Sequence, residues 1–146
     1  MDARAQAFTD LLLEVFRVNG LLLAAGDDLT RPVGLTSARW QVLGVAEHGP
    51  VPVSHVARTM GLSRQSVQVT ANGLERDGFI VFAENPHHRR AKLMRVTEKG
   101  ERALIYVREQ QGLWSERIGG EQDLAGLEKA LEVLRGVRGS LERDVP

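Results

Sequence analysis

Two short stretches of the chain gather side chains that can make several hydrogen bonds at once. One is a run of polar residues, with the members Ser63, Arg64, Gln65, Ser66, Gln68 and Asn72. The other is a cationic cluster formed by His87, His88, Arg89 and Arg90. Gln and Asn can bond adenine at two points, and Arg can bond guanine in the same way. Ser at a helix N-terminus and Arg in a turn can bind phosphate. Both stretches therefore suit contact with the bases and backbone of a nucleic acid.

The first stretch is predicted to lie on a helix. Its apolar residues recur at i, i+4 and i+7 and form one buried stripe, Val67, Ala71 and Leu74. Ser63 can cap this helix, and Gly78 closes it. The tight turn Gly61-Leu62-Ser63 separates it from a shorter helix that has Pro52 in its first turn. This order predicts a helix-turn-helix whose second helix turns a polar face outward.

The second stretch is predicted to lie at the tip of a hairpin. The hydrophobic period changes from 3.6 to 2 after Gly78, which indicates strands at residues 79–84 and 91–97. Asn85-Pro86 between them favours a turn. A hairpin in this position is a wing, so the sequence predicts a winged helix-turn-helix.

Further helices are predicted on both sides of this unit. One covers residues 7–29, and another begins at a Thr36 or Ser37 cap and stops before Gly49-Pro50. Thr97 caps a long helix that runs to Ile118. The last helix carries a leucine stripe at Leu124, Leu127, Leu131, Leu134 and Leu141.

The expected fold class is mainly α with a small β-wing, a winged helix-turn-helix domain flanked by N- and C-terminal dimerisation helices. Residues 1–146 are expected to form a single domain, with a DNA-binding lobe at 35–99 and dimerisation helices at 7–30 and 100–143. The terminal helices carry apolar stripes that a small wing domain cannot cover, and a second copy of the chain can cover them. The sequence therefore predicts a homodimer.

The charge distribution favours a nucleic-acid partner although the net charge of the 146 residues is zero. Residues 54–99 carry eight basic and four acidic side chains, a balance of +4. Residues 1–53 carry four basic and six acidic side chains, and residues 100–146 carry seven and nine, so each end has a balance of −2. Salt screens charges beyond about 10 Å, so a basic middle can bind DNA within a neutral protein.

Composition argues against several other classes of protein. There is no cysteine, which removes disulfides and thiolate metal sites. Neither a membrane span nor a signal peptide is apparent, so a cytoplasmic location is expected. No nucleophile with a paired histidine and acid and no Gly-rich phosphate loop is visible, so an enzyme is not expected. His87-His88 lacks further ligands at a recognised spacing, so neither a metal nor another cofactor is expected.

Three segments together resemble one family. They read L-T-S-A-R-W-Q-V-L, then H-V-A-R-T-M-G-L-S-R-Q-S-V, then N-P-H-H-R-R-A-K-L-M-R-V-T-E-K-G, within residues 35–104. Their order and spacing are similar to those of the multiple antibiotic resistance regulator (MarR) family. The resemblance implies a dimer with interlocked first, fifth and sixth helices that binds a pseudo-palindromic operator, often as a repressor. It also implies that Arg89 and Arg90 are the paired wing arginines.

The chain departs from the family pattern at several positions. The family usually has an aspartate just before the two arginines, where this chain has His88. A protonated His88 would repel the arginines, so wing contact with DNA is expected to depend on pH. Phe82 and Ala83 stand where arginines are common, and Gly73 stands where an arginine is frequent in the recognition helix. A glycine inside a helix costs about 0.5–1 kcal/mol relative to alanine.

The resemblance also implies a small-molecule effector, often a phenolic or aromatic acid, bound between the dimer helices and the DNA-binding lobe. By position, the residues that could line such a cavity are Phe16, Arg17, Trp40 and Tyr106. An arginine there would suit a carboxylate. The alternative is that these side chains belong to a packed dimer core.

The sequence thus predicts a DNA-binding transcription regulator that represses as a homodimer on double-stranded DNA and is released by a small effector. For the polar helix face and the wing arginines, the alternative is solvated surface. At the level of function, the alternative is a winged-helix module that binds protein and not DNA. Such a module should show a hydrophobic or acidic recognition face, whereas this one is polar and basic.

Overall fold

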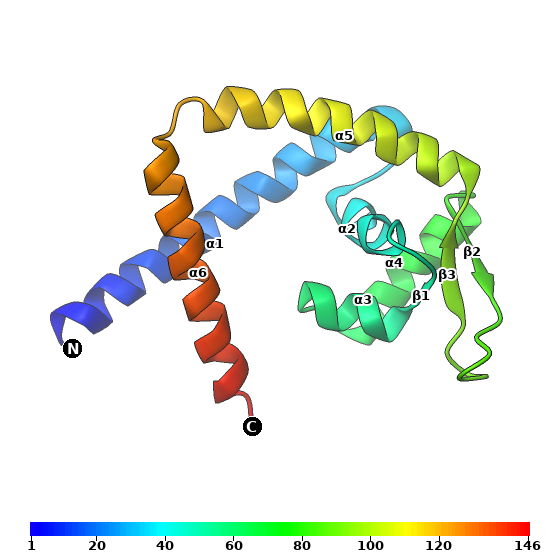
Figure 1. The fold of residues 1–146 in the computed structure, drawn as a ribbon, viewed down its shortest axis with the longest axis horizontal. Helices are drawn as coiled ribbons and strands as arrows, with labels where there is room; N and C mark the ends of the chain where they lie inside the picture. The colour runs from blue at the N-terminus through cyan, green and yellow to red at the C-terminus, as the bar shows by residue number, and fades with distance from the viewer. The chain divides into compact units, whose positions relative to one another are not determined.

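A computed structural model describes all residues from 1 to 146 (Figure 1). Its elements, in chain order, are α1 (Ala3–Thr30), η1 (Arg31–Val33), α2 (Ser37–Ala46), β1 (Val51–Pro52), α3 (Val53–Met60), α4 (Arg64–Arg76), β2 (Ile80–Ala83), β3 (Leu93–Val96), α5 (Glu98–Gly119) and α6 (Leu124–Asp144). The chain divides into two compact units, Met1–Arg108 and Glu109–Pro146. The expected fold class, mainly α with a small β-wing, is confirmed.

The core of the first unit lies among α2, α3, α4, the strands and the start of α5. The predicted stripe of α4 is fully inside it, because Val67, Ala71 and Leu74 are all buried. Other elements contribute the remaining large buried side chains, among them Val42, Leu43, Val56, Ile80, Met94 and Val107. This packing fixes which face of α4 remains in solvent.

The sheet has three antiparallel strands in the order β1-β3-β2. β2 pairs with β3 as the predicted hairpin, with Phe82 opposite Met94. β1 was not predicted, and the placement of Pro52 in the first helical turn was wrong. Pro52 instead ends β1, opposite Leu93, and is the N-cap of α3 with an extended backbone. Proline has no N–H to donate to a strand ladder, so it suits an edge strand.

Local capping explains where the helices of the first unit begin and end. Ser63 Oγ accepts a hydrogen bond from the backbone N–H of Ser66 at 3.1 Å, as expected for the cap of α4. Gly61 ends α3 in the left-handed region with φ 65°. α1 begins before the predicted residue 7, because Asp2 caps it by accepting from the N–H of Ala5 at 2.8 Å.

The junction between the wing and α5 depends on Thr97 and Gly100. Thr97 Oγ1 donates to the Gly78 carbonyl at 2.6 Å and accepts from the N–H of Gly100 at 3.2 Å. A Cβ on Gly100 would overlap the carbonyl oxygen of Phe79 and lie 2.7 Å from Val96 Cγ1. The start of α5 is therefore packed directly against the backbone that leads into β2.

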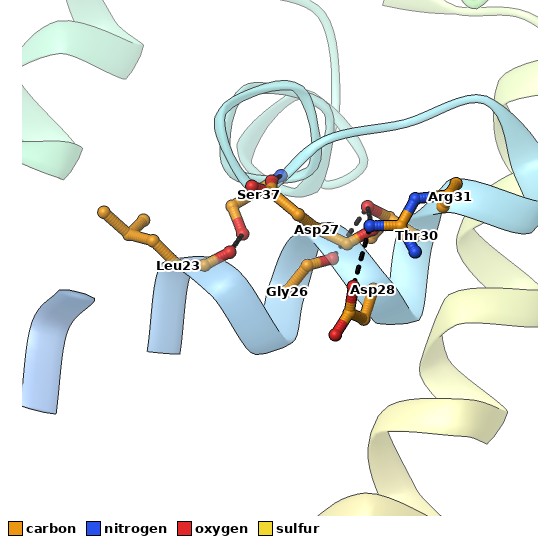
Figure 2. A network of polar contacts seen from close by, with 7 residues as sticks. All are labelled: Leu23, Gly26, Asp27, Asp28, Thr30, Arg31 and Ser37. Carbon is orange, nitrogen blue, oxygen red and sulfur yellow. Dashed lines mark hydrogen bonds and ion pairs between the residues drawn. The ribbon is translucent and has the colours of Figure 1, made fainter. Parts of the chain in front are cut away.

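A second close approach joins α1 to α2, and Figure 2 shows its polar contacts. The N–H of Ser37 donates to Asp27 Oδ1 at 2.8 Å, and Ser37 Oγ donates to the Leu23 carbonyl at 2.6 Å. A Cβ on Gly26 would overlap Ser37 Oγ. The buried Thr30 donates a hydrogen bond from its hydroxyl to the Gly26 carbonyl at 2.7 Å. The C-terminal third of α1 is thus fastened to the first turn of α2.

The two terminal helices leave apolar side chains in solvent within a single chain. In α1, Gly26 and Thr30 alone are buried, while the exposed residues include Phe8, Leu12, Leu13, Phe16, Leu21 and Leu22. α6 has no buried residue, and its predicted leucine stripe is exposed at all five positions. No helix of the chain is long and apolar enough to cross a membrane.

Candidate nucleic-acid interface

The polar face of α4 lies opposite its buried stripe. Ser63, the cap of α4, and the other five polar residues singled out from the sequence are all exposed. Two of them bond each other, because Gln68 Nε2 donates to Asn72 Oδ1 at 2.8 Å. Val69 lies on the same face and is 67% exposed. Sequence reasoning missed Val69, because it followed the polar side chains and the buried apolar stripe.

The wing tip is closed by one asparagine. Asn85 Nδ2 donates to the Ala91 carbonyl at 2.9 Å, and Asn85 Oδ1 accepts from the N–H of His87 at 3.0 Å. The Asn85 carbonyl also accepts from the N–H of His88 at 3.2 Å. These bonds hold the backbone of the tip and leave its cationic side chains exposed.

Neither wing arginine forms an ion pair within the chain. The seven ion pairs involve other residues, and the side chain of His88 makes no hydrogen bond to either arginine. The aspartate that the family pattern places before the arginines would orient them, and here nothing in the chain does so. Arg89 and Arg90 therefore keep all their donors available for a phosphate.

A hollow of about 850 Å³ separates α4 from the wing. Six of the predicted residues line it, namely Arg64, Gln65, Gln68, Asn72, His88 and Arg90. Four others, Ser63, Ser66, His87 and Arg89, are not part of its lining. Phe82 and Lys92 also line it, together with one carboxylate, that of Glu75. Two arginines and a lysine around one acid make this hollow attractive to an anion.

Gly73 has a packing role that the sequence did not reveal. It is buried, and a Cβ there would lie 2.8 Å from Arg39 Nη2. Arg39 crosses from α2 over this position and donates to Asp77 Oδ2 at 2.7 Å. Hydrogen bonding to Arg39, aided by its charge, lowers the pKa of Asp77. The glycine makes room for a link between α2 and the C-terminal end of α4.

The four residues expected around an effector differ in burial. Trp40 and Tyr106 are half-buried and pack against the core of the first unit. Phe16 is 64% exposed, and Arg17 is also exposed on α1. The effector cavity stays a prediction.

Comparison with known proteins gives this architecture a family. Residues 33–91 match the family model described as the MarR family. An uncharacterised protein of Mycobacterium tuberculosis is 34% identical over 136 residues, covering 93% of this chain and 95% of that protein. The chain belongs to the MarR family.

Two further relatives are described by what they bind or do. The crystal structure of CouR from Rhodococcus jostii bound to p-coumaroyl-CoA superposes with a TM-score of 0.78 at 26% identity, covering 88% of this chain and 91% of that one. The transcriptional activatory protein BadR of Rhodopseudomonas palustris is 27% identical over 103 residues, covering 68% of this chain and 59% of that protein. As a member of this family, the chain is a transcription regulator.

Proposed function

We propose that this protein represses transcription by binding a pseudo-palindromic operator in double-stranded DNA as a homodimer. The observation that carries the proposal is the hollow between α4 and the wing, where six predicted contact residues meet. The major groove is about 12 Å wide and admits a helix such as α4. With α4 in the groove, the wing lies beside it and brings Arg90 towards the flanking backbone.

The competing proposal of a protein-interaction module fits this face less well. A protein partner would call for an apolar or acidic surface, whereas nine of the thirteen residues that line the hollow are polar or charged and only one of them is acidic. The exposed apolar side chains of this protein are concentrated instead on α1 and α6. Their position supports burial against a second copy of the chain, and two copies would present two recognition helices about 10 bp apart.

We further propose that a small aromatic acid releases the DNA. CouR, the 26% identical relative, was crystallised with p-coumaroyl-CoA, an aromatic acyl thioester. In this chain, Trp40 and Tyr106 offer half-buried rings beside the core, and Arg17 offers a cation on α1. A ligand held between these elements would change the separation of the two recognition helices and so weaken operator binding.

DNA binding is tested with the purified full-length chain, its own upstream region and a scrambled duplex, at several salt concentrations. Arg89→Ala should weaken binding to all sequences and reduce the slope of log K against log salt by about one. Arg31→Ala is the matched control, because Arg31 is an exposed arginine paired with Asp28 on a different surface. It should leave the slope unchanged.

The outcomes separate the candidate functions. Tight, sequence-preferring and salt-sensitive binding with two protomers per site supports the proposal. No binding at low salt by a folded dimer contradicts it and favours the protein-interaction module. A reporter fused to the bound promoter then decides the sign of regulation, because BadR is described as an activator. Higher reporter output with the protein than without it would overturn repression.

A further inference from the structure

Val69 is an apolar side chain where solvent and polar neighbours surround it. It is 67% exposed on α4, one turn from Gln65 on one side and close to Asn72 on the other. The core does not need it, because the buried stripe of α4 lies on the opposite face. Among the four bases, thymine alone presents an apolar group, its C5-methyl, in the major groove. A valine at the centre of the recognition face therefore has one natural partner there.

The neighbouring Gln68 is held in place by Asn72. Its Nε2 donates one hydrogen to Asn72 Oδ1 at 2.8 Å, so its second N–H and its Oε1 remain unused by that bond. Adenine offers N7 as an acceptor and N6–H as a donor at the major-groove edge. The free N–H and Oε1 of Gln68 match this pair. The bond to Asn72 already restricts the side chain of Gln68, so Gln68 loses less conformational entropy when it binds DNA.

We infer that α4 reads an A·T-containing step, with Val69 against a thymine methyl group and Gln68 on an adjacent adenine, and with Asn72 as the residue that positions Gln68. This inference rests on the proposed DNA-binding function. It goes further by assigning the base class to named side chains. A half-site read in this way contains at least one thymine whose methyl group matters and one adenine whose N7 matters.

The thymine contact is tested on a selected operator by replacing each thymine in turn with deoxyuridine, which removes the methyl group and keeps the base pair. Wild-type protein should lose roughly fourfold in affinity at one symmetric pair of positions, the factor that corresponds to burial of one methyl group. Val69→Ala should reduce the difference between the thymine and deoxyuridine operators, because its shorter side chain makes less contact with the methyl group. The matched control is Val81→Ala, because Val81 is also an exposed valine but lies on β2 and not on α4. It should keep the wild-type sensitivity.

The adenine contact is tested with 7-deazaadenine, which lacks N7. Gln68→Ala should lose the discrimination between adenine and 7-deazaadenine, and Asn72→Ala should reduce it. Asn72→Asp should retain it, because a carboxylate still accepts the N–H of Gln68. The readout is the ratio of the affinities for the adenine and 7-deazaadenine operators. Repulsion between the new aspartate and DNA lowers both affinities equally and leaves this ratio unchanged.

The results distinguish the inference from the function on which it rests. If wild-type protein binds the operator specifically but no thymine position depends on Val69, the assignment of Val69 is wrong and DNA binding stands. If Asn72→Ala discriminates as well as wild type, Asn72 does not position Gln68. If wild-type protein shows no specific binding to any selected duplex, the inference and the proposed function fail together.

Discussion

Gly26→Ala places one methyl group at the closest approach between α1 and α2. The new Cβ would overlap Ser37 Oγ and lie 3.2 Å from Ser37 Cβ. Ser37 cannot simply turn away, because its N–H and its hydroxyl are both bonded to α1, to Asp27 and to the Leu23 carbonyl. The substitution must therefore break the hydroxyl bond, and the new methyl group then still crowds Ser37 Cβ.

The size of the effect follows from three opposing contributions. Alanine in place of glycine favours a helix by about 1 kcal/mol. Leaving the buried hydroxyl of Ser37 without a partner costs about 1–3 kcal/mol. Overpacking a well-packed contact costs about 1–3 kcal/mol more. The costs exceed the gain, so we expect a net loss of about 1–5 kcal/mol in the free energy of unfolding.

Urea unfolding at one fixed protein concentration measures this loss. Gly44→Ala is the control, because a Cβ there meets nothing within 4 Å and the change should stabilise the protein by up to about 1 kcal/mol. Adding Ser37→Ala to Gly26→Ala should recover part of the loss, since the overlapping hydroxyl is gone. A Gly26→Ala protein at least as stable as wild type would refute the reasoning about this contact.

Three further predictions concern the lobe. Gly100→Ala should destabilise by more than about 2 kcal/mol in urea unfolding, because a backbone carbonyl and not a flexible side chain is in the way; an unchanged midpoint would contradict this. Asn85→Ala should weaken operator binding in a titration while the melting temperature stays close to wild type, since the bonds it removes lie at the exposed wing tip. Because the pKa of Asp77 is lowered, its ion pair with Arg39 stabilises the fold at pH values above 3.8, the usual pKa of this carboxyl group. This stability is lost as the pH falls through the lowered pKa. Asp77→Asn should remove that part of the acid sensitivity in unfolding curves between pH 5 and about pH 2; an identical pH profile would count against the pair.

Local signals allowed much of the fold to be predicted from the sequence. Ser63 is a cap because its side chain reaches a backbone N–H three residues away, and Gly61 ends a helix because it adopts a positive φ. The buried stripe of α4 follows from spacing alone. Each of these features depends on residues within a few positions of one another, and so a single sequence reveals them.

Features that depend on distant partners could not be predicted. β1 has two residues, one of them a proline, and it exists because it pairs with β3. A glycine inside a helix indicates a weak position from sequence alone, but Arg39 occupies the space that a side chain at Gly73 would fill. Within the candidate site, residue types identified the polar contacts, but the hollow that gathers six of them depends on how the wing packs beside α4.

The short helix α2 has a consequence for how motion can pass through the lobe. Ser37 in its first turn is bonded to α1, and Arg39, two residues later, is bonded to the residue that follows α4. The first turn of α2 is thus hydrogen-bonded both to α1 and to the residue that follows α4. A shift of α1 must either carry the C-terminal end of α4 with it or break these bonds. The first turn of α2 therefore links α1 to the C-terminal end of α4.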